Sequence, residues 1–486
     1  MPRLPLTNSR TTDTLRLDHR ASSPLVWGRA CAACALLLAA LIAHAEDWSR
    51  FRGPNGSGIA TGAGYPIEFG AGKNTVWRTE VRPGKSSPVL TEKHVLLTGF
   101  TDNKLYTQCF DRASGKLLWE KFIDKKHDQI TNALNHAAAI TPLTDGRNVY
   151  SFFKDFGVVA YDLSGKELWR APLGPFVNTM GVSASPLDNG TTVVVLVDQL
   201  GGSFLAAFDK KSGEMRWKAE RDEFESWGTP LRYKDQFLTV SRGIFGAHMA
   251  ANGKRTSSLP GFPATIVGSP IVDGNRFYVF GYGADSAKPF EPELARMDKN
   301  KDGKLGPDEY LKNPLYNGYA NYQGDRDGYI TETEWAAMQQ RIMGANGLYA
   351  YEIDATAKSG EIKLRELWKY ERPFNSVIPS LVLANGVLFS VKNGGILTAF
   401  DAATGKLGKA ERIPGALGGY SSSLVAAEGR IYACSEEGKV SVIKAAQDWE
   451  VIKINDLNEG CFATPALSNG QIYLRTDNAL YRFEKK

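Results

Sequence analysis

Two stretches of the sequence place oxygen-bearing groups at the spacing that calcium needs. In the first, residues 298–309, these groups stand at loop positions 1, 3, 5, 7 and 12 and are Asp298, Asn300, Asp302, the carbonyl of Lys304 and Glu309. Calcium takes about six to eight oxygen ligands, and this spacing wraps them around one point. The stretch therefore predicts a calcium site; the alternative is an acidic surface turn that binds nothing.

The second stretch, residues 323–334, keeps most of this pattern. Asp325, Asp327, the carbonyl of Tyr329 and Glu334 stand at positions 3, 5, 7 and 12, but position 1 is Gln323. Both stretches follow the EF-hand loop, whose first position is aspartate, so the amide should weaken calcium binding here. The alternative is a partner loop that stays empty. The two loops begin closer together than in an ordinary EF-hand pair, which leaves their mutual packing open.

The segment around these loops differs from the rest of the chain. Residues 290–297 and 332–343 have the periodicity of helices, whereas most of the remaining chain consists of short alternating runs typical of β-strands. We expect an EF-hand pair inserted over residues 284–346 into a larger β-structure.

The β-rich part of the chain is a repeat. Eight peptides of the type SSPVL, ITPL and GSPI share one register, and the second residue of the shared motif carries a hydroxyl. The eight hydroxyls belong to Ser87, Thr141, Ser185, Thr229, Ser269, Ser380, Ser423 and Thr464. Most intervals have room for four strands, which is the spacing of a propeller blade. The sequence therefore predicts an all-β, eight-bladed propeller of four-stranded blades over residues 74–486, with the insertion in blade five.

Closure of the ring and contacts between blades follow from the same repeat. After Thr464 only three strands remain, so we expect residues 74–81 to supply the fourth strand of the last blade and hide its edge. The tryptophans at the outer-strand position, such as Trp77 and Trp169, are interpreted as packing between blades, with the indole N–H bound to a neighbouring carbonyl.

The repeat also indicates where the insertion lies. In an up-and-down blade the connection from the second to the third strand returns to the face where the inner strand begins. The insertion should therefore lie beside the mouth of the central channel, on the face of the eight hydroxyls. We interpret the hydroxyls themselves as partners of buried backbone groups and not as a ring of ligands.

The N-terminus has the pattern of a secretory signal peptide over residues 1–45: arginines, a short apolar run and a small-x-small site. The apolar run is shorter than the roughly 20 residues of a spanning helix. We expect an exported protein, periplasmic or extracellular, with no membrane span after cleavage and with an extended segment over residues 46–73. Cleavage removes five arginines and two aspartates, so the formal charge falls from +5 to +2. This nearly neutral net charge does not indicate binding to nucleic acid.

Three cysteines, Cys109, Cys434 and Cys461, remain after cleavage. In an exported protein they permit one disulfide, between Cys434 and Cys461, or three buried thiols.

The turns DRASGKLLW and DKKSGEMRW resemble the pyrroloquinoline-quinone-type propeller repeat that quinoprotein dehydrogenases share with the assembly propeller BamB. The opening DWSRFRGPNGSG resembles the start of secreted bacterial members of that family. The similarity covers residues 47–486 apart from the insertion. It implies the propeller fold and two different functions.

The first function is a non-catalytic scaffold that binds a protein or an envelope component on a propeller face, with calcium stabilising the insertion. The sequence contains no HExxH or GxSxG motif, and we assign no catalytic residue. The alternative is a quinoprotein alcohol or sugar dehydrogenase with pyrroloquinoline quinone as its cofactor. Its cofactor-binding residues are unknown; polar or aromatic side chains shortly before the inner strands are the candidates, namely Lys85, His136, Trp227, Asn375, Tyr420 and Glu459. The sequence has no adjacent cysteine pair and no CxxCH motif, which argues against the enzyme without excluding it. It also lacks the lipid-attachment cysteine of BamB, which argues against the same cellular role.

Overall fold

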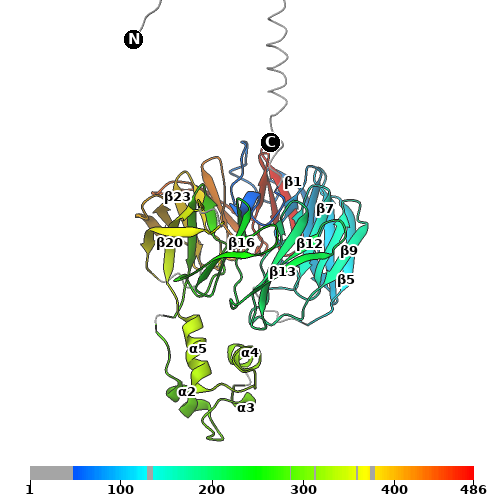
Figure 1. Cartoon of the computed structure of the whole chain (residues 1–486). Helices are drawn as coiled ribbons and strands as arrows, with labels where there is room; N and C mark the ends of the chain where they lie inside the picture. The colour runs from blue at the N-terminus through cyan, green and yellow to red at the C-terminus, as the bar shows by residue number, and fades with distance from the viewer. Residues whose placement is uncertain (1–47, 129–134, 285, 311–312, 357–359, 373–377) are drawn as a thin grey trace, which may run out of the picture. The chain divides into compact units, whose positions relative to one another are not determined.

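The computed structural model describes residues 48–486 except for 129–134, 285, 311–312, 357–359 and 373–377. Its strands form eight four-stranded antiparallel sheets arranged around a central axis (Figure 1). The predicted eight-bladed propeller is therefore confirmed. The predicted signal peptide lies outside the described residues. Among the helices that the structure describes, none is long and apolar enough to span a membrane.

The eight blades are numbered by the order of their inner strands along the chain. The strands of each blade are given from the central axis outwards. Blades 1–4 are β2 (Val89–Leu90), β3 (His94–Thr101), β4 (Lys104–Asp111), β5 (Leu117–Asp124); β6 (Leu143–Thr144), β7 (Asn148–Phe153), β8 (Gly157–Asp162), β9 (Glu167–Pro172); β10 (Leu187–Asp188), β11 (Thr192–Val197), β12 (Ser203–Asp209), β13 (Met215–Arg221); and β14 (Leu231–Tyr233), β15 (Gln236–Ser241), β16 (Ile244–Met249), β17 (Arg255–Pro260). Blades 5–8 are β18 (Ile271–Asp273), β19 (Arg276–Gly281), β20 (Gly347–Asp354), β21 (Lys363–Tyr370); β22 (Val382–Ala384), β23 (Val387–Lys392), β24 (Ile396–Asp401), β25 (Leu407–Arg412); β26 (Val425–Ala427), β27 (Arg430–Cys434), β28 (Lys439–Lys444), β29 (Val451–Asp456); and β30 (Ala466–Ser468), β31 (Gln471–Arg475), β32 (Ala479–Glu484), β1 (Thr75–Glu80).

The hydrophobic core lies between the faces of neighbouring blades. Middle strands such as β11, with the sequence TVVVLV, are buried along their whole length because a blade packs on each side. Outer strands such as β13 are mostly exposed. The last blade closes as predicted, because β1 pairs antiparallel with β32. Strands from both ends of the described chain thus complete one sheet.

The outer-strand tryptophan of one blade packs against the repeated turn of the next blade. The indole N–H of Trp169 donates to the carbonyl of Lys210 in the next blade at 2.8 Å, which confirms the predicted role. Its ring covers Gly213, where a Cβ atom would lie 2.6 Å from the indole. Gly213 also has a φ of +74°. The turn therefore needs glycine for its backbone conformation and for the close approach of the ring.

The N-terminal segment runs across the ring at the end of the inner strands. The carbonyls of Trp48 and Ser49 accept N–H bonds from Leu90 and Thr144 in blades 1 and 2, at 2.9 Å in both cases. Ala60 donates to Ala426 of blade 7 at 2.9 Å. The segment, which includes the short helix η1 (Pro54–Gly56), thus binds to inner strands on several sides of the axis and closes that end of the channel.

Four helices lie between β19 and β20 of blade 5: α2 (Phe290–Met297), α3 (Pro307–Tyr310), α4 (Pro314–Tyr322) and α5 (Glu332–Ile342) (Figure 1). We call residues 282–346 the insertion. The packing of its two loops, which the sequence left open, is direct: Leu305 and Ile330 exchange both backbone hydrogen bonds at 3.0 and 2.9 Å. Its small core, including Trp335 and Met338, also contains Leu200 and Phe224 from blade 3. The insertion therefore starts in blade 5 and packs against blade 3.

Candidate functional site

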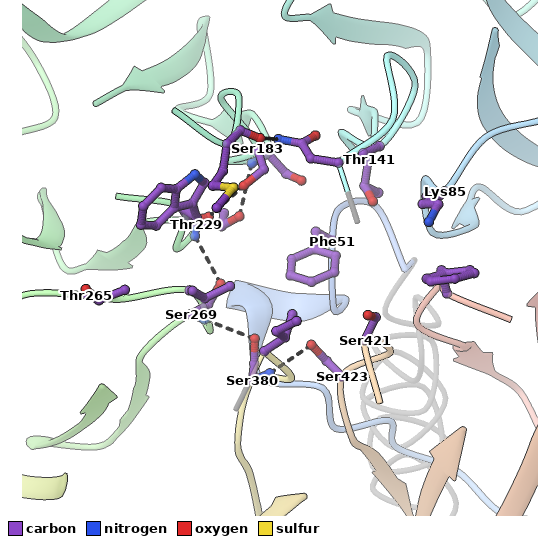
Figure 2. Close-up of a pocket in the computed structure, with 18 of the residues that line it drawn as sticks. Phe51, Lys85, Thr141, Ser183, Thr229, Thr265, Ser269, Ser380, Ser421 and Ser423 are labelled. Carbon is purple, nitrogen blue, oxygen red and sulfur yellow. Dashed lines mark hydrogen bonds between the residues drawn. The ribbon is translucent and has the colours of Figure 1, made fainter. Parts of the chain in front are cut away.

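The eight repeated hydroxyls surround the central axis and link each blade to the next. Among the described residues, seven of them accept a hydrogen bond from the backbone N–H of the equivalent residue in the preceding blade. Figure 2 shows the links that join Thr229, Ser269, Ser380 and Ser423. The links run from Ser87 to Thr141, Ser185 to Thr229, Thr229 to Ser269, Ser269 to Ser380, Ser380 to Ser423, Ser423 to Thr464 and Thr464 to Ser87, at 3.0–3.1 Å. The interpretation of these hydroxyls as partners of buried backbone groups is confirmed.

A second ring of side chains lines the channel two residues before the hydroxyls. We call it the variable ring; its members are Lys85, Ala139, Ser183, Trp227, Val267, Ile378, Ser421 and Phe462. Because successive side chains in an extended chain point to opposite sides, residues two apart face the same way. The hydroxyl ring is nearly uniform in chemistry, whereas the variable ring differs from blade to blade. Any selectivity of the channel for a ligand must therefore come from the variable ring and its neighbours.

Together the two rings enclose a cavity of about 600 Å³. Phe51 of the N-terminal segment also lines it and lies among the hydroxyls (Figure 2). Asn313 and Leu315 of the insertion contribute to the wall as well. The expected position of the insertion, beside the channel mouth on the hydroxyl face, is confirmed. The channel is thus a pocket that the N-terminal segment closes and the insertion borders.

Two cations and several aromatic rings set the chemistry of this pocket. Lys85 Nζ lies 3.3 Å from the centre of the Phe462 ring. Burial lowers the pKa of the Lys85 ammonium group, and the charges of Asp477 and Glu436 partly oppose that shift. Arg242 forms an ion pair with buried Glu225 at 3.3 Å. Among the described lining residues there is no aspartate, glutamate or histidine.

Of the candidate cofactor residues, some line the pocket, some are described but lie outside its lining, and one lies outside the described residues. Lys85 and Trp227 line the pocket. His136 packs against Phe100, and burial with the charges of Arg475, Lys85 and Lys154 lowers its pKa to about 4. Tyr420 is buried in the core between blades 6 and 7, where burial raises its pKa.

Glu459 lies apart from the pocket lining and binds Arg78 at 2.8 Å. Asn375 lies outside the described residues. The described candidates therefore do not all line the pocket.

Sequence reasoning missed most of the lining. The variable ring could have been predicted, because each member precedes a recognised hydroxyl by two residues. Phe51, Arg242, Tyr282 and Asn313 carry no comparable signal. They reach the pocket through the N-terminal crossing, the β15–β16 turn, the end of β19 and the insertion, whose positions depend on tertiary packing.

The first acidic loop, where the sequence predicts calcium, folds its backbone around its own carboxylates. The Asp298 carboxylate accepts N–H bonds from Lys301 at 2.7 Å and Gly303 at 3.0 Å. Glu309 returns to the start of the loop and accepts from Lys299 at 2.7 Å. Lys301 and Gly303 have positive φ angles of 61° and 80°. Among the described residues no three acidic, histidine or cysteine side chains are grouped as metal ligands. Calcium binding at this loop therefore stays a prediction from the sequence.

The second loop has the same backbone turns but a different first residue. Arg326 and Gly328, the counterparts of Lys301 and Gly303, have φ angles of 65° and 86°. Gln323, however, donates from its amide nitrogen to the carbonyl of Leu200 in the β11–β12 connection of blade 3. This contact gives Gln323 a docking role that an aspartate, which only accepts hydrogen bonds, cannot perform.

The three described cysteines are free and buried. Burial raises the pKa of Cys109 to about 12. The Cys434 thiol lies beside Cys461, and this neighbour together with burial raises its pKa. The structure thus contains buried thiols at the pair for which the sequence left a disulfide open.

Comparison with known proteins places the fold among two functional groups. BamB from Moraxella catarrhalis is similar over 85% of this chain and 99% of its own, with 12% identity and a TM-score of 0.54. A europium-containing methanol dehydrogenase is similar over 90% and 98%, with 10% identity and a TM-score of 0.56. The quinohemoprotein alcohol dehydrogenase of Comamonas testosteroni covers 94% and 84%, with 11% identity and a TM-score of 0.50. These likenesses concern the fold.

The comparison with curated proteins yields no significant match. A family profile described as outer membrane protein assembly factor BamB matches residues 67–258 and 201–486. The two matches together span residues 67–486, well over half of the chain. The chain therefore belongs to the family of the outer membrane protein assembly factor BamB.

Proposed function

We propose that this protein is a non-catalytic propeller of the cell envelope that binds a protein partner on its hydroxyl face, and that calcium stabilises the insertion at that face. The observation that carries the proposal is the composition of the pocket. A general acid or base needs a titratable group in contact with the substrate. The described lining offers no carboxylate and no imidazole; its titratable side chains are Lys85, Arg242 and Tyr282.

The quinoprotein alternative requires specific side chains in the same pocket. A quinone dehydrogenase needs oxygen ligands for a metal ion beside the quinone and a base at the reacting atom. The described lining lacks acidic residues, and so do the sequences of residues 129–134 and 373–377, which lie outside the described part; Asp285, three residues after the lining residue Tyr282, also lies outside it. This donor set does not fit a calcium-dependent quinone, so we derive no oxidation step from it.

The surface of the hydroxyl face supports a binding role. Leu417 and Met180 are the most exposed of the large apolar side chains in the described structure, at 81% and 55%. Leu417 lies in the β25–β26 connection and Met180 in the β9–β10 connection, so both lie on the face where the inner strands begin. Exposed apolar side chains beside a pocket are typical of interaction sites. Membership of the assembly-factor family supports a protein partner and a periplasmic or other envelope location.

Site-specific cross-linking in the native envelope tests the partner. A photo-reactive phenylalanine analogue at Leu417 should capture one reproducible protein. The same analogue at Lys211, an exposed residue of the β12–β13 turn on the opposite face, is the matched control. Equal capture at both positions, or none at Leu417, would overturn the proposed docking face.

Titration calorimetry tests calcium. Wild type should bind calcium at the first loop with the roughly 10⁻⁴–10⁻³ M affinity of extracellular sites. Glu309→Gln should remove that binding because it deletes the carboxylate at position 12. Glu332→Gln, an exposed glutamate outside both ligand sets, should bind as wild type does. Unchanged binding by Glu309→Gln would refute the site.

A further inference from the structure

The connection between β13 and β14 belongs both to the core of the insertion and to the wall of the central pocket. Phe224 is 1% exposed and packs in the insertion core, where its ring centre lies 6.1 Å from that of Tyr319 in α4. Three residues further along the chain, Trp227 lines the pocket. One short segment of chain therefore carries a side chain into each of the two structures.

Two arginines beside the Phe224 ring continue this contact in both directions. The guanidinium of Arg341 in α5 lies 5.5 Å from the ring centre, and that of Arg242 lies 5.3 Å from it. Arg242 lines the pocket and also lies 6.0 Å from the centre of the Trp227 ring. A cation within about 6 Å of an aromatic face is attracted to it. Neighbouring side chains thus lead from a helix of the insertion to the pocket wall.

Glu225 fastens the same segment to the wall. Its buried carboxylate pairs with Arg242 at 3.3 Å and accepts a hydrogen bond from the Thr179 hydroxyl at 3.0 Å. Thr179 and Arg242 both line the pocket. Breaking a buried ion pair or leaving a buried hydrogen-bonding group without its partner is costly. A displacement of the β13–β14 connection therefore moves these two lining side chains together with Trp227.

Helix α4 forms a second connection between the insertion and the pocket. Its N-cap residue Asn313 lines the pocket, and the side-chain oxygen of Asn313 accepts the N–H of Leu315, another lining residue, at 3.1 Å. The backbone N–H of Asn313 donates to the carbonyl of Tyr310 at 2.7 Å. Tyr310 directly follows Glu309, which stands at position 12 of the first loop. The last ligand position of that loop is therefore four residues from the pocket lining.

Glu309 also makes contacts that calcium would have to replace. Its carboxylate oxygens accept backbone N–H bonds from Lys299 and Gly306, at 2.7 Å in both cases. The glutamate at position 12 of an EF-hand loop binds calcium with both of its oxygens. A ligand shifts a protein only between states that it binds differently. The exchange of these two hydrogen bonds for the metal ion supplies such a difference at the start of α3.

We propose that calcium binding at the first loop controls access to the central pocket, through α4 and through the β13–β14 connection. The inference rests on the proposed calcium site and gives it a regulatory role beyond stabilising the insertion. Loading draws Glu309 towards the loop, and the insertion core carries the displacement to Asn313 and Phe224. The loaded insertion holds Asn313 and Leu315 at the rim and narrows the entrance, while Phe224 changes the surroundings of Trp227.

Fluorine NMR of the whole mature protein labelled with 5-fluorotryptophan tests the coupling. Single replacements of tryptophan by phenylalanine assign the signals of Trp227, Trp335 and Trp449. Calcium at about 10 mM, above the roughly 10⁻⁴–10⁻³ M affinity of extracellular sites, should shift the signals of Trp335 in the insertion core and Trp227 in the pocket wall. The signal of Trp449, in the core between blades 6 and 7, should stay in place. Glu309→Gln should abolish both shifts.

Phe224→Leu separates the coupling from calcium binding itself. This variant should keep the Trp335 shift and reduce the Trp227 shift, whereas Phe204→Leu, the same change in the core between blades 2 and 3, should keep both. A Trp335 shift without a Trp227 shift in the wild type would overturn the coupling and leave the calcium site in place. No shift of either signal would overturn both. An undiminished Trp227 shift in Phe224→Leu would refute the route through the β13–β14 connection.

Cysteine labelling measures access to the pocket without using tryptophan. Ser183→Cys places a thiol in the pocket lining, and the native cysteines of the described chain are buried. Its reaction with a small maleimide should slow at least about fivefold when calcium is added, which is the lower end of typical coupling between two sites. Ser212→Cys, at an exposed residue of the β12–β13 turn on the opposite face, should react at the same rate in both conditions. An equal or higher rate for Ser183→Cys with calcium would overturn the control of access.

Discussion

The hydroxyl ring predicts a specific loss of stability when one of its members is removed. The Oγ of Ser380 accepts the N–H of Ser269 at 3.0 Å, and both residues are almost fully buried. Ser380→Ala leaves that N–H without its acceptor, and an orphaned buried donor costs about 1–3 kcal/mol. Because the ring faces a pocket that water can enter, we expect the lower half of this range, about 1–2 kcal/mol.

The matched variant is Ser380→Thr, which keeps the oxygen and is the residue found at the same position in blades 2, 4 and 8. Urea unfolding followed by tryptophan fluorescence should show a lower midpoint for the alanine variant and a wild-type midpoint for the threonine variant. Hydrogen exchange should report faster exchange at the Ser269 amide in the alanine variant alone. Equal midpoints for wild type and Ser380→Ala, or equal losses in both variants, would refute the role of the hydroxyl.

Three further predictions concern packing, docking and pH. Gly213→Ala should lower the unfolding temperature more than Gly190→Ala does, because both glycines have a φ near +74° but only Gly213 lies under an indole ring; equal losses would contradict the Trp169 contact. Gln323→Ala should increase proteolysis within the insertion without weakening calcium binding at the first loop, whereas exposed Gln340→Ala should change neither; unchanged proteolysis would contradict the docking role. Burial and Arg221 lower the pKa of His248 to about 3. Between that pH and the unfolded pKa of about 6.5 the unfolded chain binds more protons than the folded one, so the stability of the protein should fall on acidification. Urea midpoints measured against pH should fall less steeply over that window in His248→Gln, and an identical slope would contradict the assignment.

The sequence predicted the ring of blades because one register recurs eight times and each copy carries its own turn and strand signals. The closure by residues 74–81 followed from the strand missing after Thr464. The pocket was harder to predict. Its variable ring follows from alternation along extended chain, yet Phe51 and Arg242 reach it through a crossing segment and a turn whose positions only the assembled ring determines.

Gln323 illustrates the same limit. From the sequence it is a departure from a calcium ligand pattern, and the expected consequence is weaker binding. In the structure its amide contacts Leu200 in a blade two positions away. A pattern that describes one loop contains no information about the neighbour on which that loop packs.

The proposed function predicts that the pocket does not oxidise alcohols or sugars, and an activity assay tests this prediction most directly. Purified mature protein would be incubated with pyrroloquinoline quinone and calcium and assayed for dye reduction with a panel of alcohols and sugars. Because the described lining contains no carboxylate and no imidazole, we predict no turnover above that of heat-denatured protein. Saturable turnover that Lys85→Gln or Ser183→Glu abolishes would contradict the account.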